Sequence, residues 1–417
     1  MNHRKILLAS ILGNTLEYYE FTIFATFAVQ IGKAFFINQS EFIQTVLTLG
    51  LFAVGFVSRP FGSLIFGHIG DKLGRKKALL ITIIGMSFTT FGIGCMPTCY
   101  KIGVIAPISL LLLRLLQGIF IGGEGAGSAV YVLEHKFKLK RDIIAGILIS
   151  SNFAGVVIAS AVGVIINKTI GLDSNSWRIA FIIGGVAGLL VSYMRVKLPE
   201  TVEYAEILPE DKPEIPAVRL FSKYWPQVLI VIAFGAFSSG VSYVIKGYLV
   251  IHFQNSMDFS TDKAFMYLMF TSVLLAIFPP FLAYFSNKHT YRKFIYATTV
   301  AIICAFVPIM MLISTHNTFY ILCGLALIAL LAAAICTPVY IYFSDMFPTE
   351  VRYSGVAVSH NLGIVIAGFT PIVSVYLVEI TSFKFAPALY IISLAVLYLV
   401  LDVILHKKIK AHKAKFA

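Results

Sequence analysis

Long apolar stretches recur from one end of this chain to the other, and they limit what it can fold into more than any other feature does. A helix that crosses a bilayer needs about 20 apolar residues. Twelve stretches approach that length, over approximately 6–31, 42–69, 78–97, 105–133, 143–166, 177–195, 226–251, 264–286, 294–313, 318–343, 354–378 and 385–405. Their residues do not alternate between apolar and polar, as the strands of a membrane barrel do. The sequence therefore predicts an all-α polytopic membrane protein with twelve transmembrane helices.

The composition argues against a soluble enzyme. Of 417 residues, 58% are hydrophobic and only 13% are charged, about half the share that is usual in soluble proteins. The sequence contains no phosphate-binding loop, nucleophile elbow, dinucleotide fingerprint or metal-binding cluster. We therefore expect no enzymatic activity, no cofactor and no metal. The first stretch is too long for a cleaved signal peptide and carries two acids, so we expect it to remain as a helix.

The basic residues are distributed unevenly between the two sides of the predicted membrane. If the N-terminus is cytoplasmic, twenty-four Lys and Arg residues lie on the inner side, and six on the outer side: Lys33, Lys101, Lys168, Arg178, Lys263 and Lys384. Cytoplasmic loops are enriched in basic residues, so we expect both termini in the cytoplasm. This asymmetry also accounts for the net charge of +13. The expected surroundings are a lipid bilayer, with no nucleic-acid partner, and the oligomeric state is left open.

One polar connection, 197–224, stands out because it holds four prolines and six acids. It separates six predicted helices from six. We therefore predict an N-terminal six-helix half (1–196), a cytoplasmic central loop (197–225) and a C-terminal six-helix half with a short basic tail (226–417). Two such halves, related as a parallel repeat, are the organisation of one large class of transporters.

The first helix carries two carboxylates near the middle of the membrane. Glu17 lies about 16 Å along the helix, and Glu20 lies one turn further on the same face. A charged side chain at this depth is costly unless it serves a function or pairs with another helix. Two neighbouring buried acids can share a proton, so both are candidates for proton coupling. Tyr18 and Tyr19 add aromatic surfaces that could contact a substrate.

The fourth helix carries a polar stripe at helical spacing, made by Arg114, Gln117, Glu124 and Ser128. Arg114 can bind a carboxylate through two parallel hydrogen bonds. That carboxylate could belong to a substrate or to a glutamate of the first helix, and Arg114 is the expected partner of the buried acids. Glu124 is the third candidate for proton coupling. Asn152 in the fifth helix could line a cavity or serve in packing.

The turn after the second helix reads Gly67-His-Ile-Gly-Asp71-Lys-Leu-Gly74-Arg75-Lys-Lys. Glycines permit a tight reversal, and Asp71 could approach the start of the next helix. This turn resembles the signature of the major facilitator superfamily, and the resemblance covers essentially the whole chain. It implies that Gly67, Asp71, Gly74 and Arg75 act in gating. The corresponding segment of the second half, 286–293, lacks both the aspartate and the glycine.

Further motifs are similar to those of the metabolite:proton symporter branch of this superfamily. They are the first-helix stretch, Arg59-Pro60, Gln117-Gly118, Gly122-Gly123-Glu124, Trp177-Arg178, Pro199-Glu200-Thr201 and 346–353. The resemblance implies a proton-coupled transporter of the bacterial inner membrane that imports a small zwitterion, such as proline or glycine betaine. Arg59 and Arg114 are then candidates to bind a substrate carboxylate.

An alternative within the same branch is a symporter of a dicarboxylate such as 2-oxoglutarate. Such a substrate needs two cationic groups, which Arg59, Arg114 and Lys246 could supply. Lys246 lies about 20 residues into the seventh stretch, where it could also reach to the outer interface. A channel or a membrane enzyme is a remoter alternative, disfavoured by the two-half layout and the lack of a selectivity filter or nucleophile set.

Overall fold

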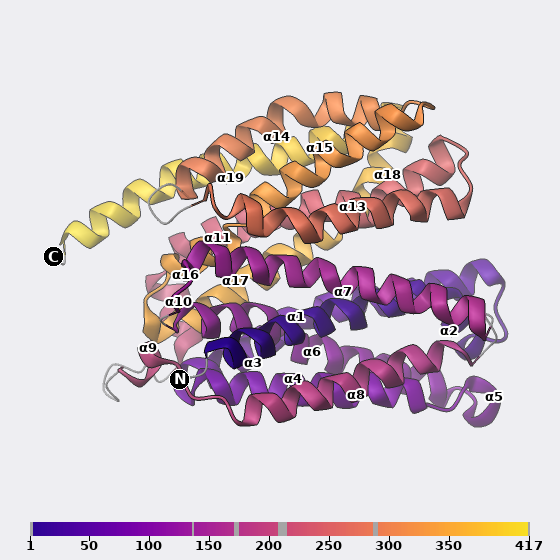
Figure 1. Ribbon diagram of the computed structural model, residues 1–417, viewed down its shortest axis with the longest axis horizontal. Coiled ribbons are helices and arrows are strands. Elements are labelled where there is room, and N and C mark those ends of the chain that lie inside the picture. Colours follow the sequence, from indigo (N-terminus) through magenta and orange to yellow (C-terminus); the bar gives the residue numbers. More distant parts are fainter. Residues whose placement is uncertain (1–2, 136, 171–174, 207–214, 287–290, 416–417) are drawn as a thin grey trace. The chain divides into compact units, whose positions relative to one another are not determined.

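The computed structural model describes residues 3–135, 137–170, 175–206, 215–286 and 291–415. Within these ranges the chain forms helices and no strand (Figure 1). The first part contains α1 (His3–Thr26), α2 (Ala28–Phe35), α3 (Glu41–Lys72), α4 (Arg75–Cys95), α5 (Cys99–Ile102), α6 (Ile105–Leu133), α7 (Arg141–Thr169), α8 (Trp177–Val196) and α9 (Val202–Ala205). The remainder contains α10 (Pro216–Lys223), α11 (Trp225–Tyr243), η2 (Val244–Tyr248), α12 (Leu249–Ile251), η3 (His252–Ser256), α13 (Thr261–Leu282), α14 (Tyr291–Ile313), α15 (Thr318–Cys336), α16 (Val339–Met346), η4 (Thr349–Val351), α17 (Arg352–Gly368), α18 (Thr370–Thr381) and α19 (Ala386–Lys415).

Eleven helices of the described residues are long and apolar enough to cross a membrane. The 24-residue α1 is not among them, because Asn14, Glu17 and Glu20 dilute its apolar character. Helices suit the interior of a membrane because every backbone group in the hydrocarbon must find its hydrogen-bond partner within the protein. The predicted all-helical membrane architecture is confirmed.

The described chain divides into two compact units, and the division falls inside α7. Unit 1 holds Met1–Lys136 and Ser151–Pro216, and unit 2 holds Phe137–Ser150 and Ala217–Ala417. The predicted boundaries at 196 and 226 stay a prediction, and residues 207–214 of the predicted central loop lie outside the described ranges.

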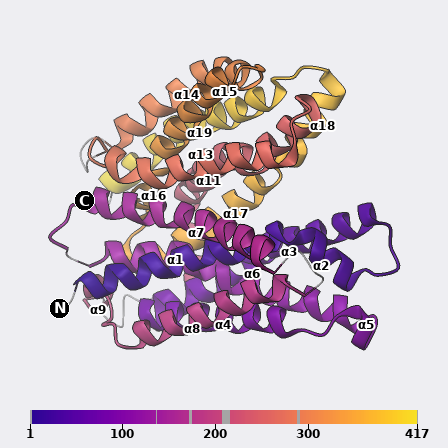
Figure 2. The same ribbon diagram turned by 45° about the vertical axis from the view of Figure 1, so that its right-hand side comes forward.

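In unit 1, α3 packs along α6, and α4 packs along both α6 and α8 (Figure 2). Glycines allow the close approach of α3 and α6, because a methyl group at Gly62 would overlap the backbone of Ile119. A cluster of large apolar side chains, including Phe24, Trp177 and Phe181, fills one part of this unit. Helix α1 lies against α6 and α8, so its acids are enclosed by these helices.

In unit 2, α11 packs against α17 and α19, while α14 lies beside α15 and α19 (Figure 1). Aromatic side chains join these helices, since the Phe234 ring contacts the rings of Tyr342 and Tyr398. Between α11 and α13 the backbone winds as a π-helix at η2 and again at η3. π-Helical segments are rare in proteins overall, but those that occur are often found at functional sites.

Candidate transport site

Glu124 is the most completely paired of the three predicted acids. It is fully buried in α6, and Arg195 of α8 contacts both of its carboxylate oxygens, with 2.9 Å between Nη1 and Oε2. Thr82 of α4 donates to the same carboxylate at 2.6 Å. The carboxylate of Glu124 therefore joins three helices of unit 1, by an ion pair to α8 and a hydrogen bond to α4.

Glu17 has a looser cationic partner. Its Oε1 lies 3.8 Å from Nη1 of Arg59 in α3, while Oε2 has no hydrogen-bond partner within the described ranges. This second oxygen lies over Gly125 of α6, where a methyl group on the glycine would stand only 2.8 Å from it. The Arg59 guanidinium also lies 5.1 Å from the ring centroids of Phe21 and Phe56.

Glu20 is only 1% exposed, and its hydrogen bonds come from neutral donors. Thr90 of α4 donates to Oε2 at 2.6 Å, and Gln117 of α6 donates to the same atom at 3.2 Å. No Lys or Arg in the described part of the chain forms an ion pair with Glu20. It therefore differs from Glu17 and Glu124 in having no directly paired positive charge.

Arg114 reaches Glu20 through intermediates rather than directly. Its Nη1 donates to Gln117 at 2.6 Å, and Gln117 donates to Thr90 at 2.7 Å. The guanidinium covers the Phe24 ring at 3.8 Å, and its Nε and Nη2 find no hydrogen-bond partner in the described part of the chain although the side chain is buried. The expectation that Arg114 pairs with the buried acids is therefore corrected: Arg195 pairs with Glu124 and Arg59 with Glu17.

The remaining predicted contacts of unit 1 have different surroundings. Tyr19 is buried and donates its hydroxyl to the Ala180 carbonyl at 2.8 Å, which joins α1 to α8. Tyr18 is half-buried, and Asn152 of α7 is buried. Tyr19 therefore has a packing role here, whereas the roles of Tyr18 and Asn152 stay predictions.

Lys246 belongs to unit 2 and lies in the π-helical segment η2. Its Nζ lies 6.0 Å from the centroid of the Tyr243 ring, at the edge of the range for a cation–π contact. The position in a π-helix is a local feature that the apolar pattern of the sequence did not predict.

The predicted gating turn forms a buried ionic cluster. Helix α3 continues through Asp71, so the turn itself is only Leu73-Gly74, and Gly74 adopts a φ of +115° that few other residues tolerate. Arg75 donates to Asp71 at 2.8 Å and to both oxygens of Glu134 at 3.2 Å. Gly67 is buried within α3.

The Pro199-Glu200-Thr201 segment completes this cluster. The Glu200 carboxylate accepts from the Lys76 amide at 3.2 Å, so it caps α4 from a distant part of the chain. Thr201 donates to Glu134 at 2.7 Å. The sequence placed this segment after the sixth helix but did not show that it meets the turn.

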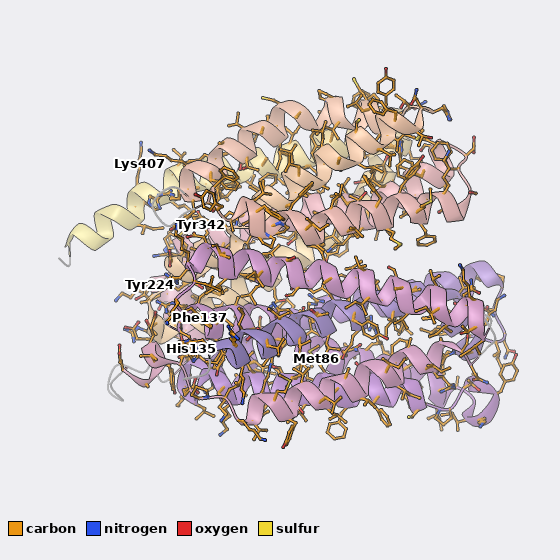
Figure 3. The ribbon with its side chains drawn as sticks, viewed as in Figure 1. Met86, His135, Phe137, Tyr224, Tyr342 and Lys407 are labelled. Atoms are coloured by element: carbon orange, nitrogen blue, oxygen red, sulfur yellow. The ribbon has the colours of Figure 1, made fainter. Side chains whose placement is uncertain are left out.

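His135 follows Glu134 at the end of α6 (Figure 3). It is 3% exposed, and its ring contacts that of Tyr131. Burial lowers the pKa of His135. Protonation of this buried imidazole at low pH would therefore be unfavourable and would oppose the packing of the cluster.

Unit 2 holds a different ionic cluster beside its own basic turn. Arg292 of α14 donates to Asp402 of α19 at 2.7 Å, and Tyr342 donates to the other Asp402 oxygen at 2.8 Å. The predicted second-half copy of the gating turn spans 286–293, of which 287–290 lie outside the described residues. The sequence analysis did not single out Asp402, although it is an isolated charge within the predicted stretch 385–405 and could have been found by that signal.

Comparisons with known proteins agree with this architecture. The model of the Major Facilitator Superfamily matches residues 10–369. The proline/betaine transporter of Escherichia coli (strain K12) is 30% identical over 414 residues, which cover 96% of this chain and 83% of that protein. The ectoine/proline transporter ProP of Corynebacterium glutamicum is 29% identical, with 93% of this chain and 81% of that protein covered.

Solved structures show the same fold. The proton:xylose symporter XylE, bound to 6-bromo-6-deoxy-D-glucose, superposes with a TM-score of 0.76 at 16% identity, covering 97% of this chain and 95% of that chain. The human organic anion transporter MFSD10 (TETRAN) gives 0.73 at 16% identity, with 97% and 100% covered. The chain belongs to the major facilitator superfamily, and it is an integral membrane transporter, as the sequence predicted.

Proposed function

We propose that this transporter imports a small zwitterion, such as proline or glycine betaine, together with a proton by alternating access. The relatives named above, which are about 30% identical over most of their length, support the substrate class. The single observation that supports it within the chain is Arg114, whose buried Nε and Nη2 have no hydrogen-bond partner among the residues that the structure describes. A guanidinium with two free donors is suited to a carboxylate.

The nitrogen of a zwitterion needs an acidic or aromatic surface. Glu17 and Tyr18 of α1 are the candidates to supply it, since Oε2 of Glu17 has no hydrogen-bond partner among the described residues and Tyr18 adds a half-buried aromatic ring. Tyr19 is the weaker candidate because its hydroxyl already donates to Ala180. Arg59, Gln117 and Asn152 then position these groups.

We assign the coupling proton to Glu20. It is held by neutral donors, so it can gain or lose a proton without breaking an ion pair. Glu124 is fixed by Arg195, and Glu17 is partly compensated by Arg59. Glu17 and Glu124 tune the site by their charge.

The experiment is uptake of labelled proline into proteoliposomes under an imposed pH gradient. Proline accumulates, unlabelled betaine competes and 2-oxoglutarate does not. Accumulation of 2-oxoglutarate without transport of proline would establish the dicarboxylate alternative, and Lys246→Ala would then abolish most activity. Exchange of labelled for unlabelled solute separates a carrier from a channel.

Orientation and gating complete the proposal. Both termini lie in the cytoplasm, and Asp71 with Arg75 stabilises the closed cytoplasmic side. In a cysteine-free background, a cysteine introduced after Lys407, or near Asp211 outside the described residues, resists an impermeant thiol reagent in intact cells. Labelling of either site from outside would reverse the orientation.

A further inference from the structure

Helix α10 presents apolar side chains on its outer face, although it is too short to cross a membrane. Val218 and Phe221 lie one turn apart on α10, Trp225 begins α11, and all three are exposed. Leu220, in contrast, is fully buried. We call the exposed face formed by Val218, Phe221 and Trp225 the α10 surface.

Basic residues border the α10 surface. Lys223 ends α10 and lies 5.7 Å from the Tyr224 ring. Lys408 of α19 lies 5.8 Å from the Trp225 ring, which brings the end of α19 to this surface. Lys407 is exposed beside Lys408 (Figure 3). The negative charge of Glu350 also acts on Tyr224, and there the positive charge of Arg219 opposes it.

The position of the α10 surface limits what can cover it. Tyr224 and Trp225 stand where the span Trp225–Gln254 begins. Tyr and Trp are enriched where helices enter the membrane. An amphipathic helix at that level lies in the interface with its apolar side in the acyl boundary and its cations at the headgroups.

We propose that the α10 surface binds anionic phospholipid headgroups at the membrane surface, with Lys223 and Lys408 contacting the phosphate-bearing groups. The apolar residues fit the lipid boundary, and the surplus of cations fits a negatively charged leaflet. A soluble protein partner would satisfy the cations but would have to reach residues at the start of a membrane span.

The tryptophans allow a direct test, because the chain has only two. Trp177 is fully buried whereas Trp225 is 42% exposed. The difference in fluorescence between the parent protein and Trp225→Phe therefore reports on Trp225 alone. We reconstitute both proteins with equal fractions of brominated phosphatidylglycerol or brominated phosphatidylcholine, which quench tryptophan on contact.

The expected result is stronger quenching of Trp225 by brominated phosphatidylglycerol than by brominated phosphatidylcholine, and a smaller preference in high salt, where the attraction is screened. Lys408→Gln and Lys223→Gln each reduce the preference for the anionic lipid by about fivefold. The matched control is Lys197→Gln, since Lys197 lies 4.5 Å from the Tyr193 ring in unit 1, whereas the α10 surface belongs to unit 2. It leaves the Trp225 signal unchanged.

Phe221→Ser tests the apolar part and reduces quenching by both lipids, whereas Leu73→Ser, at an exposed leucine of unit 1, does not. Equal quenching by the two brominated lipids in low salt would overturn the charge selectivity. Absence of quenching by either lipid would show that water or a protein covers the surface, and would overturn the proposal entirely. Neither result bears on the transported solute.

Discussion

Glu124 and Glu20 lie in the same bundle of unit 1 but in opposite electrostatic surroundings. Glu124 meets a guanidinium with both oxygens, whereas Glu20 is held by a threonine and a glutamine. An ion pair of this kind resists removal of either partner, because the other charge is then buried alone. A carboxyl held by neutral groups can change its charge with less disturbance. The comparison separates an acid that joins helices from the acid to which we assign the coupling proton.

The largest effect is expected when the ion pair is broken. Arg195→Ala leaves Glu124 without its cation inside the bundle and should cost about 3–5 kcal/mol of stability. Thermal unfolding of the purified protein in detergent measures this loss. The double variant Arg195→Met with Glu124→Gln removes both charges and should recover much of it. If Arg195→Ala unfolds at the same temperature as the parent protein, the pair does not stabilise unit 1.

Glu20→Gln should have the opposite profile. The amide oxygen can still accept from Thr90, so stability should fall by less than about 1 kcal/mol. Accumulation driven by a pH gradient should disappear, a loss of about tenfold for each pH unit of gradient if one proton is coupled. Exchange of labelled solute should persist.

The measurement is paired uptake and exchange in proteoliposomes, with Glu17→Gln as the comparison. The charge of Glu17 is partly compensated by Arg59, so we expect Glu17→Gln to lose only part of the accumulation driven by the pH gradient. Retention of the parental pH response in both variants would exclude the first helix from proton coupling.

The sequence was informative about which residues matter and less so about which residues meet. Isolated charges in apolar stretches identified Glu17, Glu20, Glu124 and Arg114, since such charges are costly without a role. Their partners depend on which helices lie side by side, and the local sequence does not encode that. Arg195, the last residue of the predicted stretch 177–195, was therefore not singled out, yet it is buried within α8.

The gating turn shows the same limit. A compact motif predicted Asp71, Gly74 and Arg75 together because these residues are neighbours in the chain. Glu134 comes from elsewhere in the chain and carries no signal of its own in a single sequence. Glu200 stood in a recognised motif, but that motif did not show that its carboxylate meets the turn.

The ion pair between Arg292 and Asp402 allows a test of whether exposure weakens a pair like that of Arg195 and Glu124. It is fully buried, but Arg292 is 30% exposed and two tyrosines also donate to the carboxylate. Arg292→Ala should therefore cost less than Arg195→Ala, about 1–2 kcal/mol, because water and the tyrosines can partly replace the guanidinium. Thermal unfolding of the two variants side by side gives the answer. Equal losses would mean that the tyrosines do not compensate.

The smallest effect on transport is expected when the threonine that donates to each glutamate is replaced by valine. Thr82→Val removes a hydroxyl from Glu124, and Thr90→Val removes the corresponding hydroxyl from Glu20, with little change in side-chain volume. Each should cost about 1 kcal/mol of stability.

Their effects on transport should differ, because Glu124 keeps Arg195 while Glu20 loses one of its two donors. With less support for the ionised carboxylate, Thr90→Val should move the midpoint of the pH–uptake curve to higher pH, and Thr82→Val should leave it in place. Uptake measured across a pH series for the two variants decides this. An equal shift in both would mean that the two glutamates titrate as one coupled group, and the separation of their roles would then be wrong.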